Sequence, residues 1–351
     1  MITASSSETF VASQARQNRV TLRKTVISCA LLAGALLLAI VLMSLIGSEQ
    51  LPARASLCAL ASLGTTPCDL TRDQFDILFQ IRLPRILLAA AVGGSLATAG
   101  AAYQALLRNP LAEPYLLGIS NGAAVGTMLA LIFFGTIEWT RPVLAFTGAL
   151  LATLAVYRLA RGRAGATPER LILAGVIVTT FLSSVIVFVT TLMDATRIRS
   201  FTFWLLGDLS GTSKALLPIA ITITVGGALA LTLHARSLNL LMLGERDAFD
   251  LGVEVGRVRV VVFLVASLLV GSSVAASGSV GYVGLVVPHL ARLSLGSDNR
   301  ISIPAAALGG ALFVIVADAV ARTIIAPREL PVGAITALIG APLFIYLLKK
   351  V

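Results

Sequence analysis

The stretch RLPRILLAAAVGGSLATAGAAYQALLRNPLAEPYLLGISNGAAVG, residues 82–126, decides the fold. An apolar segment rich in small residues follows the opening arginines and runs to the polar sequence QALLRNP. Pro110 lacks an amide N–H and disfavours helix at Asn109 before it, so the first helix should stop here. A second apolar segment begins at Gly118. The stretch therefore predicts two membrane helices that meet at a tight polar turn.

The composition is that of an integral membrane protein. Hydrophobic residues make up 57% of the 351 residues and charged residues only 13%, which is unlike a soluble domain. The net charge of +10 raises the question of a nucleic-acid partner. The basic residues lie in short groups between apolar runs, which is typical of membrane-protein loops, so we expect no nucleic acid to bind.

Apolar segments of roughly the 20 residues that a span requires recur along the whole chain. They lie near 26–47, 86–107, 115–135, 142–160, 171–192, 214–234, 258–276, 281–295, 304–323 and 332–348. The first is too long for the apolar region of a signal peptide and is interpreted as an uncleaved helix. The sequence thus predicts an all-α polytopic bundle of about ten transmembrane helices over residues 26–350, after a cytoplasmic segment, 1–25. The eighth segment is short and contains Pro288, so it need not cross fully.

The basic residues also predict the orientation. If the N-terminus is cytoplasmic, most of the 27 Lys and Arg residues fall on the cytoplasmic side, as the positive-inside rule requires. Ten spans then place both termini in the cytoplasm. Cys58 and Cys68 fall in an outside loop, where they can form a disulfide; two free thiols are the alternative.

Chemistry-bearing residues are sparse inside the spans. Asp318 is the clear case, and Arg322 lies one helical turn further on, so we expect the two to pair. No G-x-x-x-x-G-K-[ST] motif is present, which assigns any ATP hydrolysis to another chain. No metal-ligand cluster or nucleophile–base set stands out either. The sequence predicts no cofactor, no metal site and no enzymatic activity of its own.

The cytoplasmic loop 236–259, RSLNLLMLGERDAFDLGVEVGRVR, has the pattern of a docking element. Gly244 and Gly252 should break it into two short helices. The pattern predicts an apolar side at Leu240, Leu241, Leu243, Ala248, Leu251 and Val253, and a charged side at Glu245, Arg246, Asp247 and Asp250. Such an element suits a groove on a partner protein. An interfacial helix on lipid is the alternative, but the mixed charge favours a protein partner.

Several short motifs, taken together, resemble one family. They are RLPR and Q-x-x-x-R-N-P-L-A-x-P in the opening stretch, L-L-G-I-S-x-G-A after them, L-G-E-x-x-A-x-x-L-G-V in the loop, G-x-V-G-Y-V-G-L-V-V-P-H-L-A-R at 278–292, A-D-x-x-A-R at 317–322 and E-L-P-V-G at 329–333. Over about residues 75–350 the chain resembles the FecCD-like permease subunits of bacterial ABC importers for iron chelates and vitamin B12.

The resemblance implies a homodimer in the bacterial inner membrane with the substrate pathway at its interface. Two ATPase subunits would bind on the cytoplasmic side and a periplasmic substrate-binding protein on the other. The substrate would be a metal chelate: ferric siderophore, haem or cobalamin. The competing class is a stand-alone secondary transporter or channel. The scarcity of intramembrane acids and the docking-like loop count against it.

The matching motifs also imply roles for individual residues. Arg82, Arg85 and Arg322 would meet acidic residues of the binding protein; anchoring at the membrane edge by snorkelling is the alternative. Asn109 and Leu111 would lie near the cytoplasmic gate. Contacts to the ATPase subunits would come from Leu243, Gly244, Glu245, Ala248, Leu251 and Gly252.

Overall fold

The structure is a computed structural model that describes residues 22–47, 49–66, 68–134, 137, 139–162, 165–211 and 215–349. Over these residues the chain is helical apart from its connections and one pair of two-residue strands, β1 (Arg161–Gly162) and β2 (Gly165–Ala166), which pair antiparallel. The predicted all-α class is confirmed.

Each of the ten predicted apolar segments contains a helix. These helices are α2 (Leu22–Leu45), α5 (Leu83–Leu106), α6 (Ile119–Phe133), α7 (Thr140–Ala160), α8 (Pro168–Thr190), α10 (Leu216–Leu233), α13 (Val255–Ser277), α14 (Val283–Leu295), α15 (Asn299–Thr323) and α16 (Val332–Leu348). Seven helical stretches of the described residues are long and apolar enough to cross a membrane, while α6, α14 and α16 are shorter. At 1.5 Å per residue, α14 is about 20 Å long, less than the ~30 Å hydrocarbon core.

Several further elements lie outside the predicted spans. They are α3 (Ala53–Ala61), α4 (Arg72–Asp76), η1 (Ile77–Arg82), α9 (Ala195–Leu205), α11 (Ala235–Leu243) and α12 (Glu245–Asp250). A short helix, η2 (Pro114–Leu117), occupies the start of the predicted segment 115–135. The helical stretch that contains α5 begins at Arg72, well before the predicted start near residue 86, and is 35 residues long. Thr71 starts it with a capping box, in which its side chain accepts from Gln74 N–H and the Gln74 side chain accepts from Thr71 N–H.

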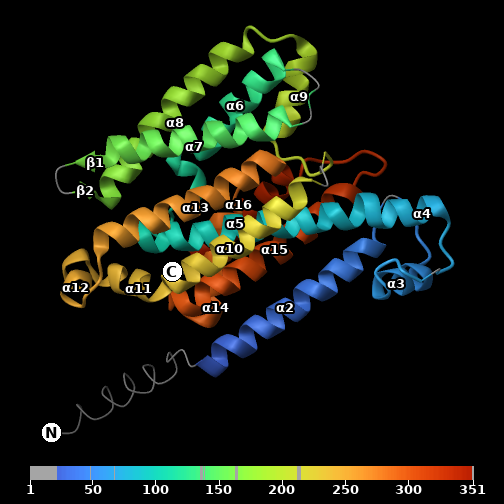
Figure 1. The fold of residues 1–351 in the computed structure, drawn as a ribbon, viewed down its shortest axis with the longest axis horizontal. Coiled ribbons are helices and arrows are strands. Elements are labelled where there is room, and N and C mark those ends of the chain that lie inside the picture. The colour runs from blue at the N-terminus through green and yellow to red at the C-terminus, as the bar shows by residue number, and fades with distance from the viewer. Residues whose placement is uncertain are drawn as a thin grey trace.

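Helix α5 is the centre of the bundle, with 89% of its most apolar window buried. It packs on α15, α13, α14 and α10 (Figure 1). Small residues allow these contacts: a Cβ at Gly93 would lie 2.1 Å from the carbonyl oxygen of Gly310, and one at Gly100 would lie 1.9 Å from that of Gly284. The backbones of α5, α14 and α15 therefore approach each other as closely as small-residue faces permit.

The connections gather at two opposite ends of the bundle. In Figure 1, α3 and α4 lie at one end, and α11, α12 and the β1–β2 hairpin lie at the other. Helix α2 runs along the outside, with only 6% of its apolar window buried. The two ends carry the candidate functional residues.

Candidate docking, coupling and gate sites

The polar turn after α5 is shaped by Asn109. Its Oδ1 accepts the N–H of Leu111 at 2.9 Å, and its carbonyl accepts the N–H of Ala112 at 3.0 Å. Arg108 before it adopts a left-handed conformation with φ of 50°. This Asx-type turn reverses the chain and leaves the Leu111 side chain 48% exposed. The two residues assigned to the gate are therefore adjacent, one forming the turn and the other presenting an apolar side chain.

The segment after this turn is held against the start of α14. Glu113 Oε1 accepts the N–H of Tyr282 at 3.2 Å. The Tyr115 hydroxyl donates to the carbonyl of Val280 at 3.0 Å and accepts the N–H of the same residue at 2.9 Å. Non-helical backbone between apolar helices needs such partners, because hydrocarbon offers none. The turn is thus tied firmly to the 278–283 connection.

The loop 236–259 forms the two short helices predicted from its glycines. Gly244, with φ of 145°, separates α11 from α12, and Gly252, with φ of 84°, follows the end of α12. Both values lie where glycine is favoured over other residues. The break into two helices is confirmed.

The predicted apolar side of the loop is wrong as a single surface. Leu241, Ala248 and Val253 are buried against the bundle, whereas Leu243 and Leu251 are 68% and 62% exposed. Short helices separated by a sharp turn present different faces to the bundle, so one helical periodicity cannot describe both. Phe249 on α12 is likewise 71% exposed, so this end of the molecule presents three large apolar side chains to its surroundings.

One buried arginine attaches α12 to the bundle. Arg259 on α13 donates from its Nη1 to the carbonyl of Ala166 at 2.6 Å, and its Nη2 lies 2.5 Å from Glu245 Oε1. Glu245 is the first residue of α12, and Ala166 belongs to β2. The coupling segment, α13 and the hairpin after α7 therefore meet at one guanidinium.

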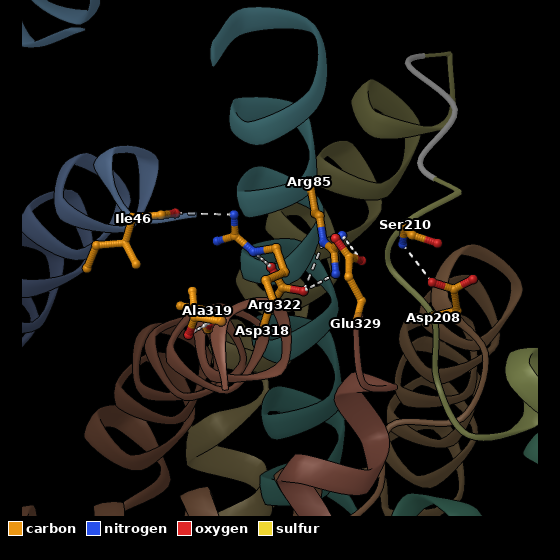
Figure 2. A network of polar contacts seen from close by, with 9 residues as sticks. Ile46, Arg85, Asp208, Ser210, Asp318, Ala319, Arg322 and Glu329 are labelled. Atoms are coloured by element: carbon orange, nitrogen blue, oxygen red, sulfur yellow. Dashed lines mark hydrogen bonds and ion pairs between the residues drawn. The ribbon is translucent and has the colours of Figure 1, made fainter. Parts of the chain in front are cut away.

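At the opposite end, two of the predicted docking arginines, Arg85 and Arg322, meet in one polar network (Figure 2). Arg85 Nε donates to Asp318 Oδ1 at 3.0 Å, and its Nη1 donates to Glu329 Oε2 at 2.7 Å. Arg322 Nε lies 3.0 Å from Asp318 Oδ2, in an ion pair without hydrogen-bond alignment. The expected pairing of Asp318 with Arg322 is confirmed, and Arg85 joins it from a distant part of the chain.

Arg82 and Arg322 also hold the end of α2. Arg82 Nη1 donates to the carbonyls of Ser44 and Leu45 at 3.2 and 3.3 Å, and its Nη2 donates to that of Glu49. Arg322 Nη1 lies 3.5 Å from the carbonyl of Ile46. The last carbonyls of a helix have no partner within it, and basic side chains satisfy them well.

The structure thus brings the three arginines together but buries them. Arg82, Arg85 and Arg322 are 4%, 7% and 6% exposed. The accessible member of the network is Glu329, whose side chain is 43% exposed. A partner that approaches this end meets Glu329 before it meets the arginines.

The cysteines of the same end are bonded to each other. A disulfide joins Cys58 at the end of α3 to Cys68, with the two Cα atoms 6.0 Å apart. It closes the loop between α3 and α4. Cys29 lies within α2 as a free thiol.

Sequence reasoning missed the roles of Arg259 and Glu329. In the sequence, Arg259 was grouped with the charges of the loop. It lies four residues into the apolar helix α13, however, and this position indicates that its side chain is buried. Glu329 stood within a recognised motif, but nothing in the sequence pairs it with Arg85, 244 positions away. Within the described ranges, no three His, Cys, Asp or Glu residues cluster as metal ligands would.

The fold is that of a polytopic helical bundle, with a polar network at one end and a pair of short helices at the other. The chain belongs to the FecCD transport family, whose sequence model matches residues 21–350. It is 42% identical over 273 residues to the cobalamin import system permease protein BtuC of Halobacterium salinarum, covering 78% of this chain and 73% of that one. It is 39% identical over 281 residues to the hemin transport system permease protein HmuU of Yersinia pestis, covering 79% and 84%.

A solved structure of a related transporter has the same fold as this chain. A chain described as an inward-facing conformation of a metal-chelate type ABC transporter superposes with a TM-score of 0.81 at 31% identity. The superposition covers 92% of this chain and 99% of the other. This chain is therefore a member of the FecCD transport family with the fold of an ABC transporter permease.

Proposed function

We propose that this chain is the permease subunit of an ABC importer that moves a metal chelate, such as ferric siderophore, haem or cobalamin, from periplasm to cytoplasm. The observation that carries the proposal is the family match over residues 21–350, which includes both ends of the bundle. Two relatives of this chain are named for the import of cobalamin and the transport of hemin. The site of action is the bacterial inner membrane, with both termini in the cytoplasm.

The cytoplasmic end is the contact for two ATPase subunits. Leu243 and Leu251 are exposed beside the charged residues of α12, which suits a short element that enters a groove on a partner. This chain contributes no Walker-type lysine, so the energy of ATP arrives by movement of α11 and α12. Asn109 and Leu111 act at the gate, where the exposed leucine closes against a second copy of the chain.

The opposite end receives the periplasmic substrate-binding protein. Arg85 and Arg322 pair with the buried Asp318 and the half-exposed Glu329, and Arg82 has Glu49 as its nearby carboxylate. Guanidinium groups bind carboxylates in two-pronged pairs, so carboxylates of an acidic partner surface can take the place of the exposed Glu329 at this end. Because the arginines are buried, docking requires Glu329 to move aside.

Uptake by purified components tests the proposal. The permease is reconstituted in liposomes with its ATPase subunits and loaded binding protein, with cyanocobalamin, hemin and a ferric hydroxamate as separate probes. We expect one probe to accumulate only when ATP, ATPase and binding protein are all present; a catalytically inactive ATPase is the control. Accumulation driven by an ion gradient without the ATPase would instead identify a stand-alone transporter.

A further inference from the structure

Arg259 is a buried cation at the cytoplasmic end of a membrane-length helix. It lies in the second turn of α13 and is 6% exposed. A charge taken out of water must find partners, because an unpaired buried ion is strongly unfavourable. Both of its partners lie on other elements, Glu245 at 2.5 Å and the carbonyl of Ala166 at 2.6 Å.

These two partners belong to segments that share a cavity. Glu245, Arg246 and Phe249 of α12 line a cavity of about 400 Å³ together with Gly165 and Ala166 of the hairpin. Arg259 is also part of the wall. Its planar fork spans this space, and a guanidinium can hold two acceptors at fixed angles in a way that an ammonium cannot.

The start of α8, which follows the hairpin in the chain, connects the hairpin in space to the polar turn after α5. Ala166 is followed directly by Thr167, the N-cap of α8, whose Oγ1 accepts from Arg170 N–H at 3.5 Å. In the first turn of α8, Glu169 Oε1 lies 4.0 Å from Arg108 Nη2. Arg108 immediately precedes Asn109. A series of contacts thus runs from α12 to the turn that presents Leu111: the Glu245–Arg259 ion pair, the hydrogen bond of Arg259 to the Ala166 carbonyl, the chain from Ala166 to Glu169, and the Glu169–Arg108 ion pair.

We propose that Arg259 is a positioning residue that transmits movement of α12 to the β1–β2 hairpin and on to the Arg108–Leu111 turn. The proposal rests on the proposed function, which makes α12 the ATPase contact and this turn part of the gate. When an ATPase subunit displaces α12, Glu245 pulls the guanidinium, and the guanidinium pulls β2. The last link, Glu169 to Arg108, is exposed and adjusts as the turn moves.

The chain offers a matched control on the same helix. Arg257 lies two residues before Arg259 but is exposed, with 79% of its side chain accessible, and its Nη1 lies 3.7 Å from Glu254. Arg257→Gln removes the same charge from the same turn of α13. It touches neither Glu245 nor Ala166.

The test follows the gate directly and needs no transported substrate. Leu111→Cys is introduced in a Cys29→Ala background, and the permease–ATPase complex in liposomes is labelled with a water-soluble maleimide, with and without ATP and vanadate. With Arg259 intact, we expect nucleotide trapping to change the labelling rate at least about fivefold, the lower end of usual allosteric couplings. Arg259→Gln should reduce that change to less than about twofold, and Arg257→Gln should preserve it.

Two further variants guard against a merely structural effect. Arg259→Lys keeps the charge but reaches one acceptor at a time, so the complex should assemble while most of the nucleotide response is lost. Glu245→Gln should reproduce the loss, and adding it to Arg259→Lys should cause no further loss. A full response in Arg259→Lys, or additive losses in the double variant, would overturn the proposal. No response with Arg259 intact, in an assembled complex, would instead contradict the gate assignment in the proposed function.

Discussion

Asp318 balances the charge of the buried arginine network. Its side chain has no exposed surface and faces the guanidinium groups of both Arg85 and Arg322, whereas the Glu329 side chain is 43% exposed. Removing one partner of a buried ion pair leaves an uncompensated charge in a medium that solvates it poorly. The two carboxylates of the network should therefore differ in their effect on stability.

We predict that Asp318→Asn lowers the free energy of unfolding by roughly 3–5 kcal/mol, since two buried arginines lose their shared counter-ion. Glu329→Gln should cost at most about 1 kcal/mol, as for exposed ion pairs. Thermal unfolding of the purified variants in one detergent measures the difference. Equal destabilisation by both changes would mean that Asp318 is not the main counter-ion.

Glu329 should also govern docking of the binding protein. Its carboxylate occupies Arg85 at 2.7 Å and so competes with any carboxylate that a partner brings. Glu329→Gln should raise the affinity for the cognate binding protein about twofold to fivefold, the value of one exposed ion pair. Titration against the permease complex in nanodiscs measures it, with Glu254→Gln at the opposite end as control. Unchanged affinity would mean that Glu329 does not compete with the binding protein for Arg85.

At the scale of elements, the exposed leucines around α12 carry the predicted contact with the ATPase. Leu243→Asp combined with Leu251→Asp should weaken association with the ATPase subunits at least tenfold, roughly the loss expected when central apolar contacts are removed. The change should leave the fold intact, because both side chains already lie at the surface. Leu57→Asp, at an exposed leucine of α3 at the opposite end of the bundle, is the control. Titrated co-elution of the complex measures the effect, and undiminished binding of the double variant would place the contact elsewhere.

The same elements show how far sequence reasoning extends. The ten apolar segments were predictable because a membrane fixes the length of a span, and the two short helices because glycine marks positive φ. Helix α9 was missed because its sequence, ATRIRSFTFWL, has neither the length nor the apolar run of a span. The faces of α11 and α12 could not be assigned, since the angle between two short helices depends on the dihedrals of Gly244.

Long-range pairing was likewise out of reach. The i, i+4 spacing predicted the ion pair of Asp318 with Arg322, a local contact. The contact of Arg85 with Glu329 joins residues 244 positions apart, and that of Arg259 with Ala166 joins residues 93 apart. Such pairs depend on how the helices pack around α5, which cannot be inferred from the pattern of one sequence. The predicted topology was enough to group the arginines at one end, but their burial depends on that packing and could not be predicted.

At the scale of the whole molecule, the two ends of the bundle differ in both charge and chemistry. The end with α3 and α4 contains the disulfide, which requires an oxidising compartment, and the majority of the Lys and Arg residues in the sequence assign the end with α11, α12 and the hairpin to the cytoplasm. Both features independently predict that α3 faces the periplasm and α12 the cytoplasm. The predicted directions of binding-protein docking and of import depend on this orientation.

Cysteine labelling should establish that orientation. In a Cys29→Ala background the disulfide-bonded cysteines do not react with maleimide, so a single introduced thiol reports its own side. Arg54→Cys on α3 and Asp250→Cys on α12 replace exposed residues and should leave the fold unchanged. An impermeant maleimide should label Arg54→Cys in spheroplasts and Asp250→Cys in inverted membrane vesicles, while the background protein stays unlabelled. The reverse pattern would place α12 outside and contradict the ATPase contact, because ATP is supplied on the cytoplasmic side; labelling of both positions in one preparation would indicate mixed orientations.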